Sequence, residues 1–131
     1  MSTILVVDDL PAIRVPVATV LRGEGHKVLC ASNGVEALAA VREEIPDLIL
    51  LDVLMPEMGG LEFLRRLRSM PAARHVPVIL LSAAEGEKDI LKAAQYGVHG
   101  YLLKTHFSLR QLLARVAKDL AETPRRSPKA A

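Results

Sequence analysis

The sequence predicts an α/β fold in which a doubly wound, five-stranded parallel sheet carries helices on both faces. First, short apolar runs alternate along the chain with segments of helical periodicity, as in β-α-β units. Second, half of the 131 residues are hydrophobic but only 3% are aromatic, so the core is aliphatic, as in parallel strands covered by helices. Third, right-handed crossovers leave few strand orders, and we adopt 2-1-3-4-5, the common order for this length.

The first strand is expected at residues 4–7, a run rich in β-branched side chains that ends at Asp8-Asp9. A helix should follow, because Pro11 suits a first helical turn and apolar residues then recur at helical spacing, at Ile13, Val17, Val20 and Leu21. Pro16 lacks the N–H that a helix interior uses, and its ring crowds the preceding turn. We therefore expect this helix to be kinked or to start late.

The second strand is expected at residues 27–31 and contains Cys30, the single cysteine of the chain. A lone cysteine rules out a disulfide within the chain and a cysteine zinc site, and on an apolar strand we expect it to be a small core residue. Asn33, with Glu36 three residues later, predicts a helix start. The apolar face of that helix consists of Ala37, Leu38 and Val41.

The third strand is expected at residues 46–52, because a short apolar run lies between Pro46 and the turn formers Pro56 and Gly59-Gly60. Such a run indicates a strand buried on both faces, and this one ends in Asp52. Apolar residues at helical spacing then predict a helix through Leu61, Leu64 and Leu67. Its other face, Arg65, Arg66 and Arg68, is expected to be solvated.

The last two strands are expected at residues 76–81, followed by Ser82, and at residues 100–103, followed by Lys104. A weaker helix, at about residues 85–96, should end at Gly97 with a left-handed cap. Ser108 and Gln111 form a capping-box pair. The final helix places Leu109, Leu112, Leu113, Val116 and Leu120 toward the core.

One domain is expected at residues 1–122, followed by a disordered basic tail or linker stub at 123–131. The tail carries three positive charges, which leaves 14 basic and 15 acidic residues in the domain. The domain therefore has no basic footprint for nucleic acid. No apolar run reaches membrane-spanning length, and the first residues do not resemble a signal peptide. We expect no membrane contact and a cytoplasmic location. The histidines, His26, His75, His99 and His106, show no ligand spacing and are expected at the surface.

Polar residues close four of the five expected strands: Asp8-Asp9, Asp52, Ser82 and Lys104. In a parallel sheet all carboxyl ends share one edge, and ligands bind there, at the point where the strand order reverses. At ~5 Å and an effective dielectric near 20, each pair of carboxylates costs about 3 kcal/mol. Mg²⁺ would remove that cost, since it takes one or two carboxylates plus phosphate oxygens. Lys104 and Ser82 would then suit a phosphoryl group, which a carboxylate can accept covalently.

These residues belong to a longer set of motifs, which lie in order over nearly all of residues 3–121: Val7-Asp8-Asp9, Asp52 with Met55-Pro56, Gly60-Leu61-Glu62-Phe63-Leu64, Ser82-Ala83-Ala84, Gly97 and Tyr101-Leu102-Leu103-Lys104. Together they resemble the receiver domain of bacterial two-component response regulators, of the chemotaxis-regulator type. The resemblance is specific because no single motif carries it. It implies a flavodoxin-like fold and a signalling phosphoacceptor rather than an enzyme that turns over a substrate.

By this resemblance, Asp52 is the phosphoacceptor. It would receive its phosphoryl group from a sensor histidine kinase, a histidine phosphotransfer protein or a small phosphodonor. Asp9, Asp52 and the backbone carbonyl of Leu54 would bind Mg²⁺ directly, and Asp8 would act largely through a metal-bound water. Lys104 would pair with a phosphoryl oxygen.

Ser82, with Ala83 beside it in the phosphoryl-binding set, would bond another phosphoryl oxygen. Tyr101 resembles the switch aromatic that turns inward when Ser82 moves. The signal would reach a downstream protein through a switched surface, as a monomer or a phosphorylation-dependent dimer.

The chain departs from the family at Thr105, where the family usually has a proline in a cis bond, so the loop after Lys104 is expected to differ. Leu54 and Ala84 occupy positions that tune phosphoryl lifetime in the family. Both are apolar, which predicts slow self-dephosphorylation. Pro16 lies in a helix that often meets the kinase.

Three other classes of function compete with a phosphoacceptor. The first is a receiver-like interaction module that works without phosphate, which Thr105 favours and the intact acidic and phosphoryl-binding set disfavours. The second is a flavodoxin-like cofactor binder, but an acidic pocket disfavours an anionic flavin phosphate. The third is an aspartate-nucleophile hydrolase, but Asp52-Val53-Leu54 lacks a second acid two residues on for acid/base work.

Overall fold

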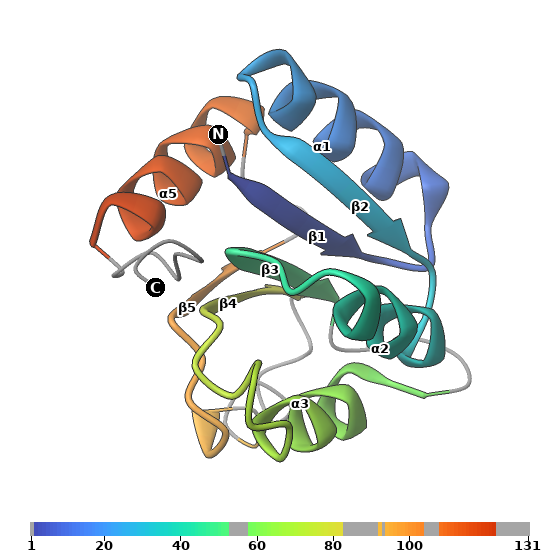
Figure 1. The fold of residues 1–131 in the computed structure, drawn as a ribbon. Coiled ribbons are helices and arrows are strands. Elements are labelled where there is room, and N and C mark those ends of the chain that lie inside the picture. The colour runs from blue at the N-terminus through green and yellow to red at the C-terminus, as the bar shows by residue number, and fades with distance from the viewer. Residues whose placement is uncertain (1, 53–57, 83–91, 93, 104–107, 123–131) are drawn as a thin grey trace.

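A five-stranded parallel sheet forms the centre of the computed structural model, which describes residues 2–52, 58–82, 92, 94–103 and 108–122. Numbered by their succession along the chain, the strands lie in the order 2-1-3-4-5, and Figure 1 shows helices packed on both sides of the sheet. The predicted fold class and strand order are therefore confirmed. Among the described residues, no helix is both long and apolar enough to span a bilayer.

The strands are β1 (Thr3–Val7), β2 (Lys27–Ala31), β3 (Leu48–Asp52), β4 (Val78–Ser82) and β5 (Gly100–Leu103). These bounds lie within two residues of the predicted ones. All five residues of β3 are buried, because β3 has a neighbour on each side and helices above and below. The prediction of a strand buried on both faces is thus confirmed.

Side chains of the central strands alternate between two separate cores. Leu5, Ile49 and Leu80 point into one core, whereas Ile4, Leu50 and Ile79 point into the other. The near-continuous apolar sequence of each strand follows from this geometry, since every residue faces one core or the other.

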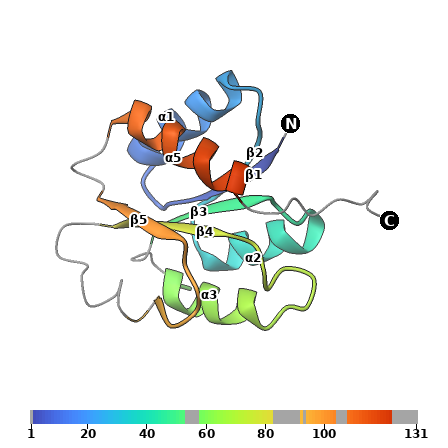
Figure 2. The same cartoon turned by 90° about the vertical axis from the view of Figure 1, so that its left-hand side faces the viewer.

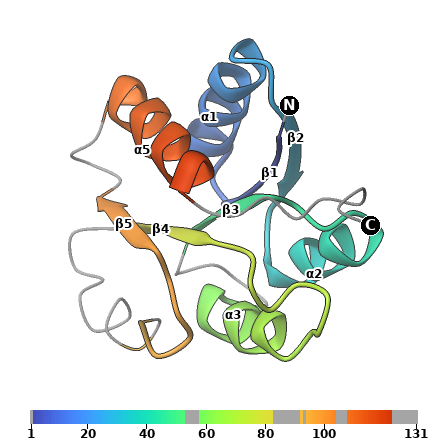
Figure 3. The same cartoon turned by 60° about the vertical axis from the view of Figure 1, so that its left-hand side comes forward.

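Helices of the described part of the chain lie over both faces of the sheet, two on each, as Figures 2 and 3 show from two sides. Helices α1 (Pro11–Gly23) and α5 (Leu109–Glu122) lie over one face, and α2 (Gly34–Glu43) and α3 (Gly60–Arg68) lie over the other. Residues of α1 and α5 share one core, and residues of α2 and α3 share the other. Most of the helix expected at residues 85–96 lies outside the described residues.

The first helix was expected to be kinked or to start late, and the late start is wrong. Helix α1 begins at Pro11 and contains Pro16. The N–H of Arg14 donates to the Leu10 carbonyl at 2.9 Å, which forms the first turn before Pro16 is reached. Pro16 is exposed, so its ring lies on the solvent side of the helix, and the core face of α1 is kept by Val17 and Leu21.

Both predicted capping pairs are confirmed. At α2, the Asn33 side chain accepts the Glu36 N–H at 2.8 Å. The Glu36 carboxylate in turn accepts the backbone N–H and the hydroxyl of Ser32, each at 2.8 Å, and these hydrogen bonds lower the pKa of Glu36. At α5, Ser108 and Gln111 exchange reciprocal bonds of 3.1 and 2.8 Å. Gly97 has the positive φ, 75°, that its predicted left-handed cap requires.

Two predictions about burial are wrong. Cys30 is exposed, because β2 is an edge strand whose residues near its carboxyl end are not all covered by α1. His26, expected at the surface, is half-buried, and its Nδ1 atom is buried. His75 and His99 are exposed as predicted, and His106 lies outside the described residues.

The prediction that Arg68 belongs to a solvated helix face is wrong. Its guanidinium donates hydrogen bonds to four backbone carbonyls, those of Arg74, Val76, Tyr96 and Gly97, at 2.6 to 3.0 Å. Partial burial lowers the pKa of Arg68, because desolvation disfavours the charged form. Arg65 and Arg66, in contrast, pair with Glu62 at the surface, and these bonds lower the pKa of Glu62 to about 2. Arg68 therefore ties the end of α3 to the chain segments that lead into β4 and β5.

We expect Arg68→Ala to lower the free energy of unfolding by about 2–3 kcal/mol, because it removes charged hydrogen bonds and leaves partly buried carbonyls without their donor. Urea denaturation measures this change. Arg65→Ala is the matched control from the same helix, and its urea midpoint should stay close to that of wild type, since the pair it breaks is exposed. Equal losses from the two substitutions would contradict the role of Arg68.

Candidate functional site

Asp8 and Asp52 lie side by side because of the register between β1 and β3. Val7 pairs with Leu51 in the parallel ladder, so the next residue along each strand is an aspartate. Side chains alternate along a strand, and Asp8 and Asp52 each follow a residue, Val7 or Leu51, that faces the α2–α3 core. Their side chains therefore project from the same face of the sheet edge.

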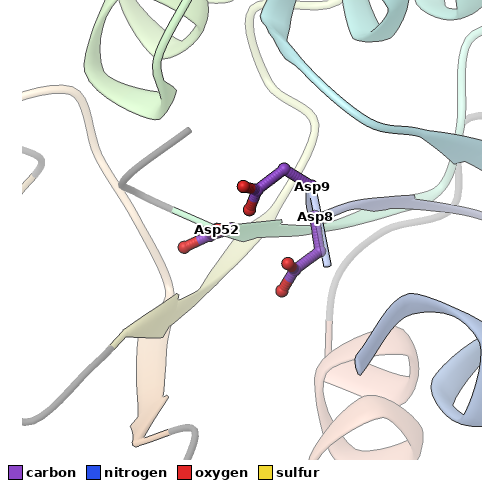
Figure 4. A group of neighbouring side chains, drawn as sticks. All are labelled: Asp8, Asp9 and Asp52. Carbon is purple, nitrogen blue, oxygen red and sulfur yellow. The ribbon is translucent and has the colours of Figure 1, made fainter. Parts of the chain in front are cut away.

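Asp9 completes a cluster of three carboxylates, and Figure 4 shows their arrangement at the ends of β1 and β3. One carboxylate oxygen from each of Asp8, Asp9 and Asp52 lies within 4.8 Å of the other two. Asp8 is fully buried, Asp52 is 3% exposed and Asp9 is half-buried. The predicted convergence of these acids at one edge of the sheet is confirmed.

The turn after β1 holds Asp8 in place through two hydrogen bonds. Its Oδ1 atom accepts the backbone N–H of Leu10 at 2.9 Å, and its backbone carbonyl accepts Nη1 of Arg14 at 2.7 Å. Sequence reasoning missed Arg14, since one arginine in the first turns of a helix carries no distinguishing pattern. Its guanidinium brings a positive charge next to the turn that carries the acidic pair.

The other predicted site residues are placed only in part. Ser82 ends β4, one residue beyond the Leu81 that pairs with Asp52, and Ser82 pairs with Leu103 of β5. Their backbones thus reach the same edge as the aspartates. Tyr101 lies on β5 and is 48% exposed. The Ser82 side chain and the residues Leu54, Ala83, Ala84, Lys104 and Thr105 lie outside what the structure describes.

The donor set fits a hard divalent cation. Three carboxylates supply only oxygen ligands, which Mg²⁺ and Mn²⁺ accept. Their oxygen atoms are close enough to share one ion, and two of the three residues are buried, where like charges repel strongly. Asp8, Asp9 and Asp52 are the described residues that would hold such an ion.

Fold and site together define a class of protein: a doubly wound α/β domain with an acidic cluster at its topological switch point. In the order β2-β1-β3-β4-β5, that point lies between β1 and β3. Asp8 and Asp9 directly follow β1, and Asp52 is the last residue of β3.

The chain belongs to the response regulator receiver domain family, whose family model matches residues 4–117. It is 41% identical over 117 residues to the DNA-binding response regulator MtrA of Mycolicibacterium smegmatis, an alignment that covers 89% of this chain and 50% of MtrA. The chain thus spans about half the length of the MtrA proteins that it matches.

Two solved structures show the same fold. One is the signal receiver domain of a signal transduction histidine kinase from Syntrophus aciditrophicus, with a TM-score of 0.85, 31% identity, and coverage of 97% of this chain and 96% of that one. The other is a CheY-like receiver domain protein from Methanospirillum hungatei, with a TM-score of 0.85, 27% identity, and coverage of 93% and 95%. The resemblance expected from the motifs is therefore confirmed, including its chemotaxis-regulator type.

We expect Asp52→Asn to raise the free energy of unfolding by about 1–3 kcal/mol in metal-free buffer, because it removes one of three clustered negative charges. Added Mg²⁺ should stabilise wild type and so reduce the difference in free energy of unfolding between wild type and Asp52→Asn. Thermal melts with EDTA and with MgCl₂ measure both effects.

Asp47→Asn is the control for this substitution. The Asp47 carboxylate accepts the Thr3 N–H at 2.8 Å at the opposite edge of the sheet, so its loss should not stabilise the protein. An Asp52→Asn variant that melts below wild type in EDTA would contradict the repulsion argument.

Proposed function

We propose that this domain is a signalling phosphoacceptor, and that Asp52 receives a phosphoryl group in a Mg²⁺-dependent reaction. The observation that carries the proposal is the cluster of Asp8, Asp9 and Asp52 at the carboxyl edge of the sheet, in a chain of the receiver family. A nucleotide is not needed at the site, since the sequence has no phosphate-binding glycine loop.

The reaction is a displacement at phosphorus. A carboxylate oxygen of Asp52 forms a bond to the phosphorus atom of the donor, and the bond from phosphorus to the donor's nitrogen or oxygen breaks. The leaving group keeps the electron pair of that bond and takes up a proton. The product is an acyl phosphate on Asp52. Because Asp52 ends a rigid, fully buried strand, its carboxylate is held in one position for this step.

The acidic neighbours of Asp52 prepare the site for a dianion. Mg²⁺, when bound, supplies positive charge that stabilises the phosphoryl oxygens. Asp8 and Asp9 would hold that ion, and the hydrogen bonds from Leu10 and Arg14 orient Asp8. Lys104 and Ser82 retain their predicted roles at phosphoryl oxygens, Ala83 stays beside Ser82 in that set, and Leu54 stays the predicted carbonyl ligand. These roles rest on the family motifs.

The phosphoryl donor proposed here is a sensor histidine kinase or a histidine phosphotransfer protein. The domain itself is a signalling module rather than a turnover enzyme, and it would pass the signal to a protein through the surface that includes Tyr101. MtrA, which is about twice as long as the matched region, is named as DNA-binding. For the residues of this chain we retain the prediction of no direct nucleic-acid or membrane contact, a cytoplasmic location and a monomer or phosphorylation-dependent dimer.

Wild type incubated with Mg²⁺ and acetyl phosphate should gain the mass of one phosphoryl group. Asp52→Asn should gain none, because an amide oxygen is a poor nucleophile, and EDTA should prevent the adduct in wild type. Intact-mass spectrometry measures all three outcomes. Asp47→Asn, which changes an acid at the opposite edge, should be phosphorylated like wild type.

The alternative function, an interaction module that works without phosphorylation, makes the opposite prediction. Wild type would then stay unmodified by acetyl phosphate and by a panel of phosphorylated kinases, and would not bind Mg²⁺. An adduct on Asp52→Asn as well as on wild type would place the modification elsewhere and also count against the proposal.

The phosphorylated form should be long-lived, because the side chains of Leu54 and Ala84 cannot orient a water molecule for attack on the acyl phosphate. The time course of adduct loss in Mg²⁺ buffer, followed by mass spectrometry after removal of the donor, measures the lifetime. Loss within seconds would contradict this expectation. Leu54→Asn, which adds a polar group, should shorten the lifetime and serves as the comparison.

A further inference from the structure

The turn between β1 and α1 carries two of the three carboxylates of the cluster. Asp8 and Asp9 are consecutive, and Figure 4 shows their side chains leaving the chain on opposite sides, with Asp52 beside both. Consecutive residues of an extended chain point away from each other. The backbone at Asp9 must therefore be held in one particular turn for both carboxylates to reach the same ion.

Arg14 of α1 is bonded to this turn through both its side chain and its backbone. Its Nη1 atom donates to the Asp8 carbonyl at 2.7 Å, and its backbone N–H donates to the Leu10 carbonyl at 2.9 Å. The N–H of Leu10 donates in turn to Asp8 Oδ1 at 2.9 Å. The residues before and after Asp9 are thus both bonded to Arg14.

These hydrogen bonds hold the two peptide groups that flank Asp9. A peptide group is planar, so a bond to the Asp8 carbonyl oxygen also sets where the Asp9 nitrogen and Cα lie. The peptide group between Asp9 and Leu10 is held in the same way, through the Leu10 N–H. Asp9 lies between β1 and α1, so its placement depends on these bonds rather than on a strand or helix ladder.

The Arg14 side chain is suited to hold a backbone carbonyl. Its guanidinium is always charged, and a charged donor makes a stronger hydrogen bond than a neutral one. Arg14 is half-buried, so water competes less for the bond. Its backbone belongs to α1, which packs on the sheet through Val17 and Leu21. The helix is therefore a fixed support for the turn.

We propose that Arg14 is a positioning residue, which sets the cation affinity of the carboxylate cluster by holding the turn that carries Asp9. The inference rests on the proposed function in that both use the same cluster, but it concerns the affinity for a divalent cation alone, without a phosphodonor. The hydrogen bonds that carry it all lie between residues 8 and 14.

Electrostatic repulsion alone predicts the opposite effect. A positive charge near a cation site repels the cation, so a neutral residue in place of Arg14 would strengthen cation binding if charge were its only contribution. A positioning role predicts weaker binding, since the loss of contacts that orient metal ligands lowers affinity about ten- to a hundredfold. The sign of the change therefore separates the two explanations.

The experiment measures Mn²⁺ affinity by electron paramagnetic resonance of the free ion, with melting temperatures of the same proteins in EDTA. Arg14→Met keeps a long side chain and removes its charge and its hydrogen bond. We expect Arg14→Met to bind Mn²⁺ about tenfold more weakly than wild type. Equal or tighter binding by a folded Arg14→Met would overturn the inference.

Arg22→Met is the matched control from the same helix. Arg22 is exposed and, like Arg14, donates to a backbone carbonyl, that of Val28, at 3.1 Å. It lies about two turns further along α1, on the order of 12 Å away. The substitution removes the same charge, so it should keep the wild-type affinity even where it lowers the melting temperature. If Arg22→Met and Arg14→Met weaken Mn²⁺ binding equally, the effect is not specific to the turn and the proposal fails.

Arg14→Lys covers the case in which Arg14→Met does not fold. An ammonium keeps the charge but lacks the rigid fork of a guanidinium. Arg14→Lys should therefore bind Mn²⁺ a few-fold more weakly than wild type and more tightly than Arg14→Met. A wild-type affinity in Arg14→Lys, together with an Arg14→Met that does not fold, would reduce Arg14 to a role in folding and end the proposal.

Phosphorylation by acetyl phosphate separates failure of this proposal from failure of the proposed function. If wild type binds Mn²⁺ but forms no adduct, the proposed function fails, while the affinities of the Arg14 variants still decide the role of Arg14. If wild type forms the adduct and a folded Arg14→Met binds Mn²⁺ like wild type, only the role of Arg14 is lost. A wild type that does not bind Mn²⁺ would overturn both.

Discussion

The parallel register between β1 and β3 is the constraint on which the site depends. Val7 pairs with Leu51, so the two strands reach their carboxyl ends together, and each continues into an aspartate. A slip of one residue would turn Asp8 or Asp52 to the opposite face of the sheet and would also expose one strand's buried side chains to the wrong core. The register that distributes the buried side chains between the two cores is thus the same property that aligns the carboxylates. Chemistry and packing are specified by one register, and neither can change without the other.

The two edges of the sheet have different electrostatic characters. At the amino edge, charged groups are satisfied: the Asp47 carboxylate accepts the Thr3 N–H, and Arg68 donates to four carbonyls around the starts of β4 and β5. Arg115, held by Asp119, likewise donates to the carbonyl before β5. At the carboxyl edge, three like charges lie within 4.8 Å of one another. The amino edge therefore supplies stability through paired charges, and a bound cation or a change of charge would relieve the repulsion among the carboxylates at the carboxyl edge.

Local patterns predicted most of the fold, and long-range contacts account for what they missed. Strand positions and both capping pairs followed from runs of a few residues, and the strand order followed from chain length and crossover handedness. The exposure of Cys30 depends on β2 being at the edge of the sheet, which its own sequence does not record. Arg68 was predicted to be exposed to solvent, like Arg65 and Arg66 beside it. The carbonyls that accept its hydrogen bonds lie up to 29 residues away in sequence, so the local pattern does not show them. The acidic cluster was predictable because parallel strands end at one edge. The hydrogen bond from the Gly34 N–H to the Met58 carbonyl was not, because it joins two backbone groups and its only trace in the sequence is the glycine.

The carboxylates and Met58, which precedes α3, are held by different backbone contacts. The carboxylates of Asp8 and Asp52 are fixed by strands, so substitutions that move them also damage the core. The Met58 carbonyl, in contrast, is held by a hydrogen bond from the backbone N–H of Gly34 at the amino end of α2.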